Sequence, residues 1–133
     1  ALGAAGEAAA VQALLDTIPP ARLSMAEALA LARADRQTGQ AARARALARD
    51  QRPLPGGQPP AELWALVAET CQGAGEPRLA LVAIDRALAR APEQAILHHN
   101  RAAILVDLGR EEEARAALAT ARRLDPQLEE GRP

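Results

Sequence analysis

The sequence predicts an all-α fold built from pairs of helices, and three observations lead to this prediction. Good helix formers, above all alanine, leucine, arginine and glutamate, fill most of the 133 residues. Glycine and proline are confined to short stretches that separate the helical segments. The stretch that ends at Pro92 is echoed thirty-four residues later by one that ends at Pro126, and an alanine precedes each proline by five residues, at Ala87 and Ala121.

The boundaries of the helices follow from the breaks between them. Two prolines at 19–20 stop the first helix, and Ser24 is a candidate N-cap for the second because its hydroxyl can accept a hydrogen bond from the first turn. Gly39 separates the second helix from the third. The stretch "RPLPGGQPP" at 52–60 holds too much proline and glycine to be helical, and we expect it to be the longest linker. The expected helices cover residues 4–17, 23–37, 40–51, 60–73, 77–90, 94–107 and 111–124.

An internal repeat relates the last two helix pairs. Alignment of 61–92 with 95–126 places glycine on glycine between the paired helices and proline on proline after the second helix. We expect each glycine to provide the left-handed or unhindered backbone that the turn between the helices needs, and the facing alanines to let the paired helices approach closely. The matched positions are Ala61/Ala95, Leu63/Leu97, Ala68/Ala102, Gly75/Gly109, Ala80/Ala114, Ala83/Ala117, Ala87/Ala121 and Pro92/Pro126.

These residues resemble the tetratricopeptide repeat (TPR), a family of 34-residue helical hairpins. The family pattern runs from a large apolar residue through small residues and a glycine to a closing proline. His98 departs from it where a large apolar residue is usual, and the chain has no Tyr or Phe. The resemblance implies a right-handed solenoid of helical hairpins. The matching residues are Trp64, Ala68, Cys71, Gly75, Ala80, Ile84, Ala87 and Pro92, and then His98, Ala102, Leu105, Gly109, Ala114, Leu118, Ala121 and Pro126.

The same resemblance divides the chain into repeats of different quality. In the degenerate pair we expect Ala32, Ala44 and Ala48 to be the small packing residues. The expected units are an N-terminal helix or half repeat at 1–20, a degenerate TPR-like helix pair with a Pro/Gly linker at 21–58, full repeats at 59–92 and 93–126, and the start of a further helix or a C-terminal tail at 127–133.

The resemblance also implies a function in protein–protein interaction. In the family, the first helix of each pair lines a concave groove that binds an extended peptide or a helix of a partner. A solvated helix surface with no partner is the alternative interpretation of the same positions. Carried over to this chain, the groove residues are Arg33, Arg36, Glu62, Ala65, Glu69, Gln72, Ile96, His99, Ala103 and Val106.

Two other hypotheses compete with a free-standing adaptor. The chain opens in the middle of a helical pattern without an initiator methionine, which favours a non-catalytic accessory domain of a larger enzyme, such as a glycosyl- or sulfotransferase, or of a polysaccharide or protein export machine. Unfinished solenoid ends would also allow homo-oligomers, since a terminal repeat without a polar cap exposes an apolar face. All sixteen basic residues are arginine, a bias that suggests a bacterium with a GC-rich genome, and either cytoplasm or periplasm fits such an array.

Composition argues against several other classes of function. A net charge of −1 and a single aromatic residue, Trp64, disfavour nucleic-acid binding, which needs basic surfaces or stacking platforms. No apolar run reaches the roughly 18 residues of a membrane span. The adjacent His98 and His99 point about 100° apart on a helix, and the lone Cys71 offers neither a disulfide nor a metal cluster. Because Ser24 is the only serine and no phosphate-binding loop is visible, we expect neither catalytic residues nor a cofactor.

Overall fold

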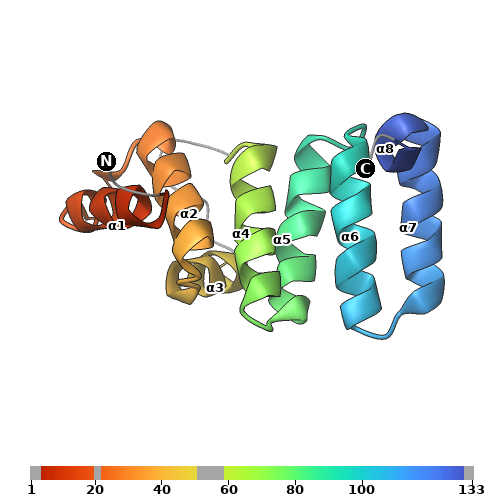
Figure 1. The fold of residues 1–133 in the computed structure, drawn as a ribbon, viewed down its shortest axis with the longest axis horizontal. Coiled ribbons are helices and arrows are strands. Elements are labelled where there is room, and N and C mark those ends of the chain that lie inside the picture. The colour runs from red at the N-terminus through yellow and green to blue at the C-terminus, as the bar shows by residue number, and fades with distance from the viewer. Residues whose placement is uncertain (1–3, 20–21, 51–58, 131–133) are drawn as a thin grey trace.

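The computed structural model describes residues 4–19, 22–50 and 59–130, and within these ranges it contains helices and no strand. The helices lie side by side along the long axis of the molecule, from α1 at one end to α7 at the other (Figure 1). Seven of them begin and end within two residues of the ranges that the sequence predicts, so the all-α class is confirmed. The helices are α1 (Ala4–Leu15), α2 (Met25–Thr38), α3 (Ala42–Arg49), α4 (Ala61–Gly73), α5 (Pro77–Arg90), α6 (Ala95–Asp107), α7 (Glu111–Leu124) and the single turn α8 (Gln127–Glu130).

Helices α2, α4 and α6 all end in the same left-handed glycine turn. The φ angles of Gly39, Gly75 and Gly109 are 74°, 75° and 75°, a region that other residues enter only at a cost. After each glycine, the next backbone N–H donates to the carbonyl oxygen five residues earlier, from Gln40 to Asp35 at 3.1 Å, from Glu76 to Cys71 at 2.9 Å and from Arg110 to Leu105 at 2.9 Å. The predicted left-handed closures at Gly75 and Gly109 are therefore confirmed.

The two C-terminal helix pairs are closely packed. Helix α4 packs along α5, and α6 packs along α7. Ala68 and Ala80 belong to one buried cluster, with 1 % and 0 % of their surfaces exposed, so the interhelical space here is filled by small side chains. Leu97 and Ile104 of α6 join the same cluster and thereby attach the last pair to the preceding one.

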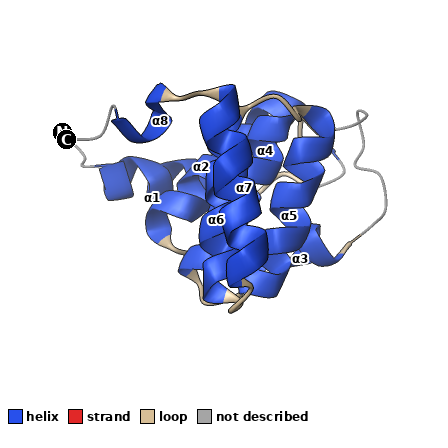
Figure 2. Ribbon diagram, turned by 90° about the vertical axis from the view of Figure 1, so that its right-hand side faces the viewer, coloured by secondary structure: helices blue, strands red, loops and turns tan. Residues whose placement is uncertain are grey.

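The N-terminal helices are arranged differently. Helix α2 packs mainly against α1 and α4, whereas α3 packs against α4 and α5. Viewed along the array, α1 and α2 lie on one side and α3 with α5 on the other (Figure 2). Ala32 of α2 and Ala44 of α3 both line a pocket left between these helices, and Ala48 is buried in the cluster that contains Trp64. Most of the expected Pro/Gly linker lies outside the described residues.

Helix boundaries follow the expected capping chemistry. Ser24 is the N-cap of α2, as predicted; its hydroxyl accepts from the backbone N–H of Glu27 at 3.1 Å, and the Glu27 carboxylate accepts from the Ser24 N–H at 2.9 Å. Helices α5 and α7 end two residues before Pro92 and Pro126, which matches their predicted role as stops. In the three described ranges, no helix combines the length and apolar character that crossing a bilayer requires.

Candidate functional site

The ten groove positions that the resemblance implies lie at the surface of three helices. Those from α2 and α4 include four charged side chains, and those from α6 are mostly apolar. Each position is exposed or half-buried, and none belongs to the buried core. We call these residues the first-helix face: Arg33, Arg36, Glu62, Ala65, Glu69, Gln72, Ile96, His99, Ala103 and Val106.

Two ion pairs connect α2 to α4 along the first-helix face. The Arg33 guanidinium contacts the carboxylate of Glu62, and Arg36 Nη1 lies 3.2 Å from Glu69 Oε2. Between a third and about half of each of these side chains remains exposed to solvent. Exposed pairs of this kind stabilise a fold by about 1 kcal/mol or less, so they neutralise this part of the face more than they hold it together.

The α6 part of the first-helix face is apolar and open. Ile96 is 45 % exposed and Val106 is 57 % exposed, and Ala103 lies between them. Their spacing places them on one side of the helix together with the half-buried His99. At the end of this stripe, Gln72 Nε2 donates to Asp107 Oδ2 at 3.0 Å and so ties the last turn of α4 to that of α6.

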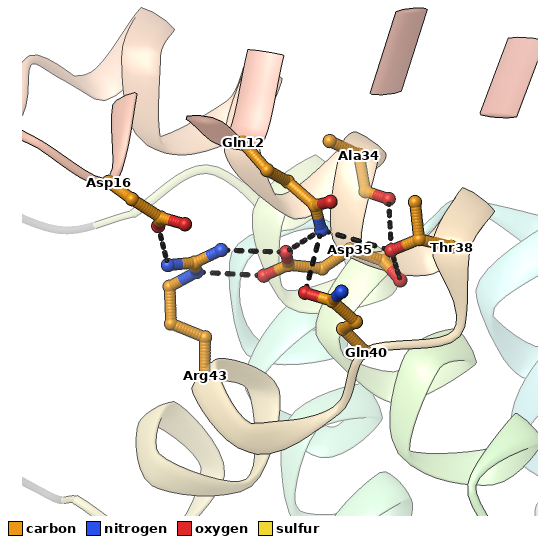
Figure 3. A network of polar contacts seen from close by, with 7 residues as sticks. All are labelled: Gln12, Asp16, Ala34, Asp35, Thr38, Gln40 and Arg43. Carbon is orange, nitrogen blue, oxygen red and sulfur yellow. Dashed lines mark hydrogen bonds and ion pairs between the residues drawn. The ribbon is translucent and has the colours of Figure 1, made fainter. Parts of the chain in front are cut away.

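A buried polar network, which is not among the predicted sites, joins α1, α2 and α3 (Figure 3). At its centre is Asp35, whose side chain is 5 % exposed. Arg43 donates to both carboxylate oxygens of Asp35, from Nε and Nη2, at 2.8 Å each, and its Nη1 pairs with Asp16. Gln12 Nε2 lies 2.7 Å from Asp35 Oδ1 and 2.9 Å from Thr38 Oγ1. The network thus fastens the end of α1 to the α2–α3 turn.

The electrostatics of this network favour the charged form of Arg43. The hydrogen bond to Asp35 raises the pKa of Arg43 above its ordinary value, against a smaller opposing effect of burial. A bidentate arginine–carboxylate pair is geometrically specific, which suits an anchor between helices. The sequence held one signal for it: Asp35 lies on the same side of α2 as Leu31 and Ala28, and a charge on an apolar helix face needs a partner.

Trp64 is part of the core, and an arginine covers it. The Trp64 side chain lies in the main buried cluster with 8 % exposed. The Arg86 guanidinium is centred 4.7 Å from its ring, and its Nη1 also donates to the carbonyl oxygens of Leu47 at 3.0 Å and Asp50 at 3.3 Å. Arg86 therefore donates hydrogen bonds to carbonyl groups at the end of α3 while its guanidinium stacks on the Trp64 ring of α4.

Cys71 and His98, which the sequence analysis considered for metal binding, have structural surroundings in the helices. Cys71 is fully buried, and desolvation raises the pKa of its thiol, which disfavours the reactive thiolate. His98 Nε2 lies 2.8 Å from the carbonyl oxygen of Pro92, a contact that joins the start of α6 to the preceding turn. Among the residues that the structure describes, no group of three or more His, Cys, Asp or Glu side chains is arranged to hold a metal ion.

Comparison with known protein families and curated proteins identifies no relative of this chain. The function is therefore inferred from the first-helix face and the internal repeat.

Proposed function

We propose that this chain is a TPR-like helical array that binds a segment of a protein partner on its first-helix face. The observation that carries the proposal is the exposed apolar stripe of Ile96, Ala103 and Val106 on α6, beside the charged surface of α4. Large apolar side chains that stay exposed on one side of a helix gain stability when a partner covers them.

The internal repeat supports the TPR-like part of the proposal. Three helices close with the same left-handed glycine, two of them thirty-four residues apart at Gly75 and Gly109. The pairs α4–α5 and α6–α7 place small residues at corresponding buried positions, such as Ala80 and Ala114. In TPR arrays, the first helix of each pair is the one that meets the partner, and α4 and α6 are those helices here.

The two parts of the first-helix face would contribute differently to binding. Full burial of a valine or isoleucine side chain is worth about 1.5–3 kcal/mol, so Ile96 and Val106 would supply most of the affinity. The charges within the ion pairs Arg33–Glu62 and Arg36–Glu69 already neutralise each other. A partner that approaches these pairs therefore gains orientation more than affinity. The best partner is an amphipathic helix or extended segment with apolar side chains against α6.

An accessory domain of a larger bacterial enzyme or export machine remains the second hypothesis. In that case the surface that Ile96 and Val106 expose would be covered by another part of the same assembly. Binding of a separate polypeptide would then be absent, and a binding experiment separates the two functions.

The test compares one substitution on two helices. The wild-type chain captures a partner from a lysate of the source organism, and titration calorimetry measures the affinity of the recombinant partner. We expect Val106→Asp to weaken binding at least tenfold because it places a charge in the apolar stripe. The matched control is Val82→Asp: Val82 lies on α5, outside the first-helix face, and is 39 % exposed.

Circular dichroism of both variants confirms that they remain helical. Equal affinities for the wild type and Val106→Asp would reject the first-helix face as the binding site. Failure of the wild type to capture any partner would favour the accessory-domain hypothesis.

A further inference from the structure

The pocket between α2, α3 and α4 has the features of a binding site. It measures about 270 Å³, and one side of each helix contributes to its wall. The exposed Ala46 lies at its rim, so the pocket is reached from solvent. The apolar wall consists mainly of Ala28 and Leu31 from α2, Ala44 and Leu47 from α3, and Leu63 and Val67 from α4.

The polar side chains around this pocket already have partners within the protein. Asp35 and Arg43 bind each other, the Thr70 hydroxyl donates to the Leu66 carbonyl at 2.8 Å, and the Ser24 hydroxyl accepts from the first turn of α2. An ordered water needs two to four polar partners, and most of the polar groups of this wall are already engaged within the protein. A charged ligand would lose hydration beside the carboxylates of Asp35 and Asp50, and Arg43 is already paired with Asp35 and Asp16.

Size and lining together define the class of ligand. An apolar cavity of about 150 Å³ holds a benzene molecule. At about 270 Å³, the pocket of this protein has room for a second fused ring. At the alanine contacts of the pairs α4–α5 and α6–α7, by contrast, Ala80 and Ala114 are buried in the core clusters.

We propose that this pocket binds a small uncharged apolar molecule of about the size of naphthalene. The site is separate from the first-helix face, and the proposal does not depend on protein–protein interaction. There are two alternative occupants. A segment of the protein's own chain would close the pocket to such a molecule, and a pocket made for a side chain of a protein partner would not select between the probe and its charged analogue.

The experiment uses 1-fluoronaphthalene as the probe and follows its ¹⁹F resonance during titration with the full chain. We expect the line to broaden and shift with a stoichiometry of one, and unlabelled naphthalene to reverse the change. We expect 1-naphthoate, which has the same rings and a carboxylate, to bind at least tenfold more weakly, because its charge would meet the carboxylates of Asp35 and Asp50 while Arg43 is already paired.

Substitution locates the site. Ala28→Phe places a ring in the pocket, so we expect at least a tenfold loss of probe binding with retained or increased melting temperature. Ala116→Phe, the same change on the exposed side of α7, leaves binding unchanged. If Ala28→Phe fails to fold, Ala32→Met fills the same wall with a more flexible side chain.

Three outcomes would overturn the proposal. The probe could show no binding to the folded wild type, which would mean that the space is occupied or closed. Ala28→Phe and Ala32→Met could bind the probe as tightly as the wild type, which would place the site elsewhere. Equal affinity for 1-naphthoate would contradict an apolar, uncharged ligand.

Discussion

The N-terminal and C-terminal halves of the array hold their helices together in different ways. From α4 to α7, paired helices lie in contact along their length, and the residues between them, such as Ala80 and Ile84, are fully buried. From α1 to α3, a polar network centred on Asp35 anchors the first helix, and α2 and α3 flank an apolar pocket. The C-terminal half is held mainly by apolar packing, and the N-terminal half combines apolar packing with a few directed polar bonds.

The turn between the helices does not explain this difference. Gly39 and Gly75 have nearly the same φ angle, and the residue after each glycine makes the same bond back to its helix. The difference lies in the helix after the turn. Helix α3 has 8 residues, whereas α5 has 14, and Leu63 and Val67 of α4 line the pocket beside the shorter helix. A shared turn therefore fixes where the chain reverses, and the length and side chains of the second helix decide how closely the pair packs.

The largest expected effect tests the packing of the two halves directly. Ile84 and Leu31 are 0 % and 3 % exposed, but only Leu31 lines the pocket. Truncation of a core isoleucine or leucine to alanine costs about 2–5 kcal/mol, and the cost depends on how tightly the surrounding side chains pack around the removed atoms. We expect Ile84→Ala to lower the free energy of unfolding by about 4 kcal/mol and Leu31→Ala by about 2 kcal/mol. Urea denaturation measures both, and equal losses would mean that the two halves are packed alike.

The second test breaks the polar anchor of the N-terminal half. Arg43→Met leaves the buried Asp35 carboxylate without its bidentate partner, and removal of one member of a buried pair is strongly destabilising. Because Arg43 is about one-third exposed, we expect a loss of about 2 kcal/mol in the α1–α3 region that the network joins, including the docking of α1. Hydrogen exchange should show about thirtyfold faster exchange of the α1 amides and no change in α4 to α7.

Two further variants sharpen this test. Arg33→Met removes an exposed ion pair from the same helix bundle and is expected to change stability by less than about 1 kcal/mol. The double variant Arg43→Met with Asp35→Leu removes both charges of the pair and should recover much of the loss. Unchanged exchange of α1 in the single variant would show that apolar contacts, rather than the network, hold this helix.

The fold could be predicted from the sequence wherever one residue type answers one backbone requirement. Gly75 and Gly109 supply a positive φ, Pro92 and Pro126 end helices, and Ser24 caps one, so the helix boundaries follow from local chemistry. These signals need no knowledge of how the helices cross.

The polar network and the pocket could not be predicted in this way. Asp35 and Arg43 are eight residues apart on different helices, and Gln12 reaches them from a third. Their meeting depends on the crossing angles of α1, α2 and α3, which sequence spacing does not contain. The residues of the first-helix face were predictable as surface positions, because the helical period of α4 and α6 separates them from buried neighbours such as Leu63 and Leu105.

The smallest expected effect concerns how the helices begin. Glu27 closes a capping box with Ser24, whereas the N-cap residues of α4 and α6, Pro60 and Gln94, make no side-chain capping bond. Two hydrogen bonds with Ser24 lower the pKa of Glu27 below its ordinary value of 4.5. The bond with the Ser24 backbone N–H has the larger effect, and the bond with the Ser24 side chain has the smaller one. A lowered pKa in the folded state means that the carboxylate stabilises the protein above about pH 4.5, and that this contribution is lost as the pH falls through the folded value.

The Glu27→Gln variant should therefore be slightly less stable than the wild type at pH 7, and the difference should narrow at pH 3, as measured by urea denaturation at both pH values. The gap must close on acidification because protonation removes the same charge from the wild type that the substitution removes from the variant. A gap that is the same at both pH values would mean that the shape of the side chain, rather than its charge, matters at this N-terminus. Helices α4 and α6 start without such a box, so no side-chain cap of this kind supports their N-termini. The size of the Glu27 effect therefore indicates how much local capping adds to the stability of α2 in the N-terminal half.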